Sequence, residues 1–116
     1  MKLNEDKVPT TLDEAIQFLR ESFSKGDIKA IKHPDFAGQG LHFTLGMYLR
    51  NNWSLWEKDT VLVQWFKKTY DIDHADDISG IILDSCFRDI RGEPRQDKKL
   101  AKRYLEHWEQ MKESGA

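Results

Sequence analysis

The sequence is poor in cysteine and proline and has no long apolar run. Cys86 is the single cysteine among 116 residues, so an internal disulfide cannot form, which is typical of proteins in a reducing compartment. Residues 1–10 mix charged and apolar side chains and therefore do not resemble a signal peptide. No segment approaches the run of about 18 apolar residues that spans a membrane. We therefore expect a cytoplasmic location and no membrane partner.

The chain also lacks a strong net charge. Its 18 lysines and arginines nearly balance 20 aspartates and glutamates, so the chain as a whole offers no general attraction for nucleic acid. Apolar residues make up 39% of the sequence and include four tryptophans, which supply enough large side chains for a folded core. We expect one helical domain over residues 1–116, with residues 1–10 as a loose N-terminal arm.

Apolar residues recur at helical spacing, which predicts an all-α protein: a single compact bundle of five or six short helices with orthogonal or irregular packing. Thr11 and Glu14 have the spacing of a capping box at the start of the first helix, and Gly26 is expected to end it. Asp27 is expected to cap a short second helix. Residues 33–40 contain a proline and two glycines and are predicted to form a loop.

Two helices are predicted in the middle of the chain, at residues 41–53 and 61–70. The first is apolar on several sides, with Phe43 and Met47 widening its apolar face, so we expect it to be the central helix. Residues 61–63 also have the composition of a strand, but no second strand of equal quality is present to pair with them.

Two more helices are predicted in the C-terminal part. The first is expected to begin at Asp76 or Asp77, where carboxylates meet free backbone N–H groups, and to end at Gly92. Pro94 is expected in the first turn of the last helix. The apolar side chains of that last helix form one stripe: Leu100, Tyr104, Leu105, Trp108 and Met111.

The most distinctive segment is HFTLGMYLRNNWSLW, at residues 42–56. His42, Gly46 and Arg50 are four residues apart and therefore share one face of the predicted helix. Because glycine costs about 1 kcal/mol relative to alanine inside a helix, Gly46 indicates that another group approaches closely. These residues could line a cleft floored by Gly46.

Arg50 has two interpretations. It could bind a carboxylate or phosphate of a ligand through two parallel hydrogen bonds, with Asn51 and Asn52 at the rim of the site. Alternatively, it could pair internally with Asp76 or Asp77, and the two asparagines could simply end the helix.

A basic run in residues 88–103 is a second candidate site. Seven cations and three acidic residues give this segment a net charge of +4, so the rest of the chain carries −6. Such a patch could bind a phosphate backbone or an acidic protein surface, or it could be a solvated helix face, since no binding motif accompanies it. The cations are Arg88, Arg91, Arg95, Lys98, Lys99, Lys102 and Arg103.

The acidic segment DIDHADD, at residues 71–77, could bind a divalent cation through oxygen. The calcium-loop template fails, however, because Asp76 and Ile82 stand where glycine and glutamate are required, so a solvated loop with a helix cap is the simpler interpretation.

Cys86 lies in an apolar helical pattern and is interpreted as a small hydrophobic residue. Catalytic and cofactor-binding motifs are absent, so we expect no metal or cofactor and favour a non-enzymatic role.

The central segment resembles a small domain family of bacterial proteins that has no established activity. The resemblance covers residues 11–92 and is carried by His-Phe-x-Leu-Gly-x-x-x-Arg-Asn-x-Trp-x-Leu-Trp at residues 42–56, then by His74, Asp76, Asp77 and an Ile-Ile-Leu run at residues 81–83. It implies a shared structural or binding role for the positions that match, His42, Arg50, Asn51 and Asp77, but no particular chemistry.

We therefore expect a protein-interaction module, such as an inhibitor or modulator of a bacterial partner protein. Tryptophan and arginine are the residues that most often dominate binding energy, and partly exposed tryptophans would support this reading. The candidate binding residues are His42, Arg50, Asn51, Trp53, Trp56 and Asp77. The alternative is a small enzyme or ligand-binding domain with a pocket around His42, Arg50, Asn51 and Asp77. Nucleic-acid binding through residues 88–103 is the third and least favoured hypothesis.

Overall fold

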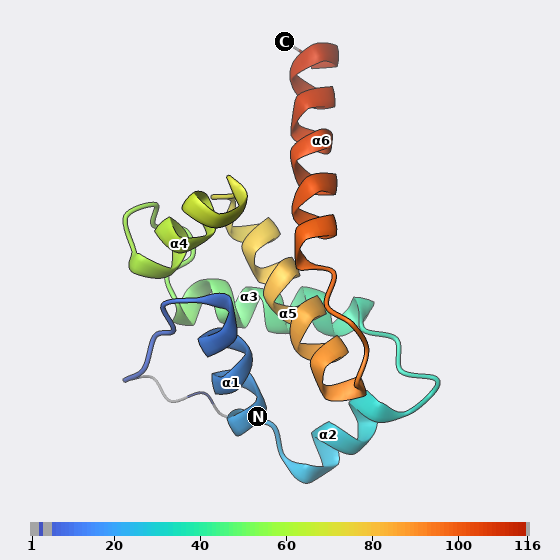
Figure 1. Cartoon of the computed structure of the whole chain (residues 1–116). Helices are drawn as coiled ribbons and strands as arrows, with labels where there is room; N and C mark the ends of the chain where they lie inside the picture. The colour runs from blue at the N-terminus through green and yellow to red at the C-terminus, as the bar shows by residue number, and fades with distance from the viewer. Residues whose placement is uncertain (1–2, 4–5, 116) are drawn as a thin grey trace.

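The computed structural model describes Leu3 and residues 6–115. Over these residues the chain forms six α-helices and no strand, which confirms the predicted all-α class (Figure 1). The helices are α1 (Leu12–Ser22), α2 (Lys25–Lys32), α3 (Gln39–Asn52), α4 (Val61–Tyr70), α5 (Ala75–Arg91) and α6 (Asp97–Gly115). Their buried side chains form one hydrophobic cluster that extends from Leu3 to Ala101.

The central helix is α5, and α1, α2, α3 and α6 all pack against it. Figure 1 shows α5 running through the middle of the molecule while α3 crosses behind it. Four apolar residues of α5, Ile78, Ile81, Ile82 and Leu83, are completely buried although they do not all lie on one face of the helix. The prediction that residues 41–53 form the central helix is therefore wrong. The outer side of α3 leaves Phe43 70% and Met47 46% exposed, so α3 covers α5 on one side only.

The start of α1 matches the prediction, but its end does not. The Thr11 hydroxyl accepts a hydrogen bond from the Glu14 backbone N–H at 3.2 Å, whereas the Glu14 carboxylate accepts from Thr10 instead of completing a capping box with Thr11. The helix ends at Ser22, followed by extended Phe23, so Gly26 does not terminate it.

A capping box that the sequence analysis missed begins α2. The Ser24 hydroxyl accepts from the Asp27 N–H at 3.0 Å, and the Asp27 carboxylate accepts from the Ser24 N–H at 2.9 Å. Asp27 is thus the third residue of the helix and not its cap, and Gly26 lies in the first turn. Reciprocal pairing satisfies two free donors at once, which favours Ser24 over Asp27 as the cap.

The later helices follow the prediction closely. Residues 61–70 form α4 with Thr60 as its cap, so the alternative of a strand at 61–63 is wrong. Gly92 ends α5 in the left-handed conformation, with φ of 73°, as predicted. Pro94, in contrast, lies in the loop before α6, which begins only at Asp97.

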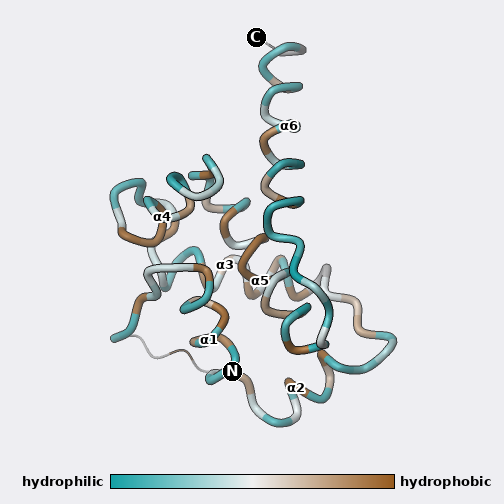
Figure 2. Tube along the Cα trace, in the orientation of Figure 1, coloured by the Kyte–Doolittle hydropathy of each residue, from teal (hydrophilic) through white to brown (hydrophobic). Residues whose placement is uncertain are grey.

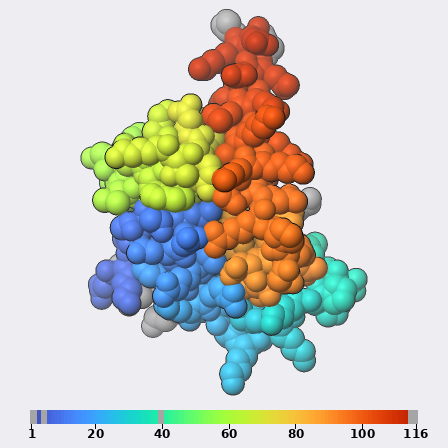
Figure 3. Space-filling view, viewed as in Figure 1, coloured from blue at the N-terminus to red at the C-terminus, as the bar shows by residue number. Residues whose placement is uncertain are grey.

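The C-terminal part of α6 projects from the rest of the molecule (Figures 1 and 3). Leu100, Ala101, Tyr104 and Leu105 pack on the core, but Met111 is exposed, so the predicted stripe ends before Met111. Figure 2 shows mostly hydrophilic residues along this projecting segment, which suits a helix that has passed the end of its packing partner. The predicted loose arm lies partly outside the described residues; within it, Leu3 and Pro9 are buried.

Two glycine substitutions are expected to have opposite effects on stability. Gly92→Ala forces alanine into a left-handed conformation and is expected to lower the free energy of unfolding by about 1 kcal/mol. A Cβ at Gly26 in α2 would meet only Ser24 Oγ, at an ordinary 3.7 Å, so Gly26→Ala is expected to raise the free energy of unfolding by up to about 1 kcal/mol. Urea denaturation of both variants measures the difference. Equal effects of the two substitutions would contradict these cap assignments.

Candidate functional site

The Arg50 side chain of α3 is bound by the first turns of α5. Its Nη1 donates to the Ser79 hydroxyl at 2.9 Å, and its Nε lies 3.3 Å from the Asp76 Oδ1 without the alignment of a hydrogen bond. Ser79 in turn donates to the Asp76 carbonyl at 2.9 Å. Only 11% of the Arg50 side chain is exposed, while Asp76 remains largely in solvent. The internal pair with Asp76 is therefore the interpretation that the geometry supports for Arg50.

Gly46 provides the space that the Arg50 guanidinium occupies. A Cβ atom at position 46 would lie 2.8 Å from Arg50 Nη1, closer than carbon and nitrogen atoms normally approach. The predicted close approach at Gly46 is thus confirmed. The approaching group is the side chain one turn further along α3, and it fills the place where a ligand cleft was considered.

Trp56 is exposed and held in place by two contacts with the end of α3. Its indole Nε1 donates to the Asn51 Oδ1 at 3.2 Å, and the Arg50 guanidinium carbon lies 5.6 Å from the centre of its ring system. The side chain is nevertheless 57% exposed. Trp53, three residues earlier, is buried in the core and cannot contact a partner directly. Asn51 therefore positions an exposed aromatic ring. The left-handed residue after α3 is Ser54, not an asparagine.

His42 lies beside the second half of α5, away from Asp76 and Ser79. Its ring packs edge-on against Phe87 at 5.6 Å and lines a cavity of about 200 Å³ together with Phe36 and Asp84. Burial lowers the pKa of His42, and the Asp84 carboxylate opposes this effect only in part. His42 is thus favoured in its neutral form.

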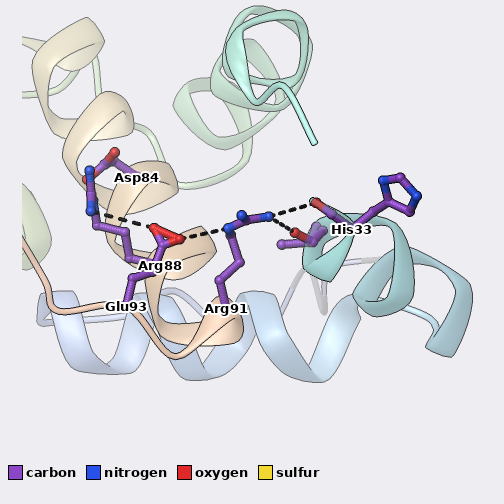
Figure 4. A network of polar contacts seen from close by, with 6 residues as sticks. His33, Asp84, Arg88, Arg91 and Glu93 are labelled. Atoms are coloured by element: carbon purple, nitrogen blue, oxygen red, sulfur yellow. Dashed lines mark hydrogen bonds and ion pairs between the residues drawn. The ribbon is translucent and has the colours of Figure 1, made fainter. Parts of the chain in front are cut away.

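Two of the seven cations in the basic run, Arg88 and Arg91, are bound within the protein (Figure 4). Arg88 Nε lies 3.0 Å from Asp84, and Arg91 Nε donates to Glu93 at 2.9 Å. Arg91 Nη1 also donates to the carbonyls of Ile31 and His33 at the end of α2, at 2.7 and 3.0 Å. A cation at that position satisfies free carbonyls and the negative end of the helix dipole.

Arg95 is a third cation of this run with a partner inside the protein, and the other four lie on α6. Arg95 Nη1 lies 2.6 Å from Asp13 at the start of α1, so it connects the α5–α6 loop to α1. Four further cations of the run lie on the first turns of α6 and are exposed: Lys98, Lys99, Lys102 and Arg103.

Asp77 faces α6, on a different side of α5 from Asp76. Its Oδ2 accepts a hydrogen bond from the Trp108 Nε1 at 2.8 Å, and the His74 ring stacks on Trp108 with 4.1 Å between ring centres. The sequence gives no signal for this contact. A carboxylate at a helix start and a tryptophan in an apolar stripe each have a local explanation, and the two residues are 31 positions apart. The candidates His42, Arg50 and Asp77 therefore lie in three separate surroundings.

Other chemistry finds little support in the described part of the chain. Burial raises the pKa of the Cys86 thiol to about 12, so this cysteine packs as a hydrophobic residue and is a poor nucleophile. The described residues contain no group of three or more histidine, cysteine or acidic side chains that could hold a metal ion. None of the described helices is both long and apolar enough to cross a membrane.

A family model for a domain of unknown function, DUF6794, matches residues 8–90. The chain belongs to this family. No curated protein and no solved structure matches it. The matched residues take in α1 to α4 and all but the last residue of α5, so the Arg50 contacts lie within the DUF6794 domain. The bond from Asp77 to Trp108 joins that domain to α6, which lies beyond the matched residues.

The fit of Gly46 to Arg50 is testable with a double-mutant cycle. In the wild-type background, Gly46→Ala is expected to destabilise the protein because the guanidinium must leave Ser79. In the Arg50→Ala background the same change is expected to stabilise it by up to about 1 kcal/mol, since only the better helix propensity of alanine remains. Urea denaturation of the four proteins should give a coupling free energy of about 1 kcal/mol or more. Additive effects would contradict the assignment.

The lowered pKa of His42 predicts a pH-dependent stability. The unfolded chain binds more protons than the folded protein between the folded pKa and the ordinary value of 6.5, so stability falls as the pH decreases through this window. The variant His42→Gln should therefore lose less stability than the wild type between about pH 7.5 and about pH 5, as measured by urea midpoints. An identical pH dependence in both proteins would show that His42 is not protected from protonation.

Proposed function

We propose that this DUF6794 protein is a protein-interaction module that binds its partner through the outer face of α3. The observation that carries the proposal is a set of three substantially exposed apolar side chains, Phe43, Met47 and Trp56, which we call the apolar strip. Phe43 and Met47 are one helical turn apart. Arg50 lies three residues after Met47 and is itself mostly buried, but its guanidinium contacts the Trp56 ring just beyond the end of α3.

The composition of the strip supports binding to protein. Aromatic residues and methionine are enriched in the centres of protein interfaces, and tryptophan is the residue most often found at binding hot spots. Trp56 is also held before any partner arrives, by Asn51 and Arg50. A side chain that is already ordered loses less conformational entropy on binding, which favours affinity.

Charge at the Trp56 end indicates the kind of partner. Glu57 and Asp59 are exposed, and Asp76 keeps most of its side chain in solvent although it pairs with Arg50. The neighbouring Lys58 is paired with Asp73 at 3.6 Å. An acidic rim beside an apolar strip suits a partner protein with an apolar groove and basic residues at its edge.

The other two hypotheses have weaker support. A single ligand pocket would need His42, Arg50, Asn51 and Asp77 to converge, but Arg50 binds Asp76 while Asp77 accepts from Trp108 on α6. Nucleic-acid binding would draw on the basic run, in which Arg88, Arg91 and Arg95 already have carboxylate partners. An interaction surface on α3 requires neither arrangement.

Affinity capture from a lysate of the native cell tests the proposal with matched variants. The variant Phe43→Ser with Met47→Ser is expected to lose a protein that the parent captures stoichiometrically, because both apolar side chains leave the interface. Val61→Ser removes an equally exposed apolar side chain from the start of α4 and is expected to retain the partner. Circular dichroism and urea midpoints establish beforehand that all variants are folded.

Charge reversal provides a second test of the same surface. Glu57→Lys is expected to weaken binding of the captured partner about tenfold, which corresponds to about 1.4 kcal/mol, and more at low salt than at high salt. The proposal would be contradicted if the parent captures no protein in larger amount than the variant Phe43→Ser with Met47→Ser does. It would also be contradicted if that variant and Val61→Ser lose the captured partner equally.

A further inference from the structure

The exposed charges of α6 are divided into two blocks, with cations in its first turns and carboxylates after them. All of these side chains are exposed, and none lies within ion-pair distance of an opposite charge in the described part of the chain. The cation block is Lys98, Lys99, Lys102 and Arg103, and the carboxylate block is Glu106, Glu109 and Glu113.

The two charges of α6 that break this order are used within the protein. Asp97, in the first turn, accepts a hydrogen bond from the Tyr70 hydroxyl at 2.6 Å. Lys112, in the last turn, lines a cavity together with Asp71 and Asp77. The charges that have no role in the described fold are therefore the two blocks themselves.

The order of the two blocks is the reverse of what a single helix favours. The start of a helix carries the positive end of its dipole and the finish carries the negative end, so cations are favoured at the finish and carboxylates at the start. Like charges four residues apart also repel, as in the pairs Lys98–Lys102 and Glu109–Glu113. Interactions within one copy of α6 therefore do not explain this order.

One stripe along the outer side of α6 carries charges from both blocks. Lys98, Lys102, Glu106, Glu109 and Glu113 follow one another at spacings of three or four residues, so they share a face of the helix. The carboxylate end of this stripe belongs to the part of α6 that projects from the rest of the molecule (Figures 1 and 3). A neighbouring helix could therefore lie along the stripe beyond the body of the protein.

We propose that α6 pairs in antiparallel orientation with α6 of a second copy of this chain. A twofold axis between residues 105 and 106 places Lys98 opposite Glu113 and Lys102 opposite Glu109, and the symmetry of the dimer repeats both pairs. Antiparallel pairing also sets each helix dipole against the opposite dipole of its neighbour. Exposed ion pairs are individually weak, so the dimer is weak and sensitive to salt.

A partner of a single charge sign fits this stripe less well than a second copy does. A nucleic acid or a wholly acidic protein segment is attracted by the cation block but repelled by the carboxylates that continue the same stripe. A second copy presents both signs in the reversed order. Because α3 contributes nothing to the stripe, the dimer carries two copies of the proposed partner surface, and this inference does not rest on the proposed function.

Sedimentation equilibrium of the full chain measures the pairing directly. A reversible monomer–dimer equilibrium is expected at up to about 1 mM protein and low salt, because each exposed ion pair contributes little. Raising the salt from about 20 mM to about 300 mM is expected to weaken dimerisation at least tenfold, since the charges are then screened over a shorter distance.

Charge exchange within one chain separates antiparallel pairing from general attraction. Lys102→Glu combined with Glu109→Lys keeps the net charge and restores an opposite-charge pair in the antiparallel dimer, so dimerisation is expected to stay within about threefold of the wild type. Glu109→Lys combined with Glu113→Lys places like charges opposite one another and is expected to abolish the dimer. Circular dichroism establishes that both variants are folded.

The position of the twofold axis is tested by removing one carboxylate at a time. Glu109→Gln is expected to weaken dimerisation, because two ion pairs are lost by symmetry. Glu106→Gln removes the same charge beside the axis, where the two copies of this carboxylate approach each other, and is expected not to weaken it.

Four results would overturn the proposal. They are a monomer at about 1 mM protein and low salt, a dimer that is insensitive to salt, loss of the dimer on exchanging the charges at 102 and 109, and equal weakening by the two glutamine variants. The variant Phe43→Ser with Met47→Ser is expected to dimerise like the wild type whatever the outcome of the lysate capture, so the two proposals can fail separately.

Discussion

The structure depends on covering most sides of α5. Ile78, Ile81, Ile82 and Leu83 point in different directions around this helix and are all completely buried, so no single neighbouring helix can cover them. Fully burying one such side chain contributes about 1.5–3 kcal/mol. α1, α2, α3 and α6 all pack against it. The arrangement is irregular because these four helices pack mainly against α5 and not against one another, while α4 packs against α6.

The two adjacent carboxylates at the start of α5 show how this arrangement produces separate sites. Successive residues of a helix point about 100° apart, since a turn takes 3.6 residues. Asp76 therefore reaches Arg50 on α3, while Asp77 reaches Trp108 on α6. One consequence is an ordered Trp56 just beyond the end of α3, and the other is a buried carboxylate that is hydrogen-bonded to α6. The proposed partner surface and the contact between Trp108 and Asp77 thus lie on different sides of the same helix terminus.

Features that depend on a few neighbouring residues could be predicted from the sequence. The bounds of α4, the stop at Gly92 and the close approach at Gly46 all follow from local spacing and conformational preference. The sequence allowed two interpretations of Arg50. In the structure Arg50 pairs with an acidic residue at the start of α5, which was one of the two. Membership of an uncharacterised domain family was also confirmed.

Features that depend on relative placement could not be predicted in this way. Residues 41–53 and 75–91 are both apolar on several sides, and periodicity alone does not say which helix is enclosed and which keeps Phe43 and Met47 in solvent. Met111 continues the apolar stripe of α6, but half of its surface is exposed, which spacing along the helix does not reveal. The bond from Trp108 to Asp77 requires the packing of α6 to be known.

Amide hydrogen exchange resolved by residue tests the central claim, which is that α5 is enclosed and α3 is its cover. The amides of residues 81–87 should exchange only through global unfolding, and those of residues 43–49 on α3 should exchange faster through local opening. The projecting residues 109–113 of α6 should exchange fastest of the three segments. Slower exchange in residues 43–49 than in residues 81–87 would place α3 at the centre of the fold and contradict the account.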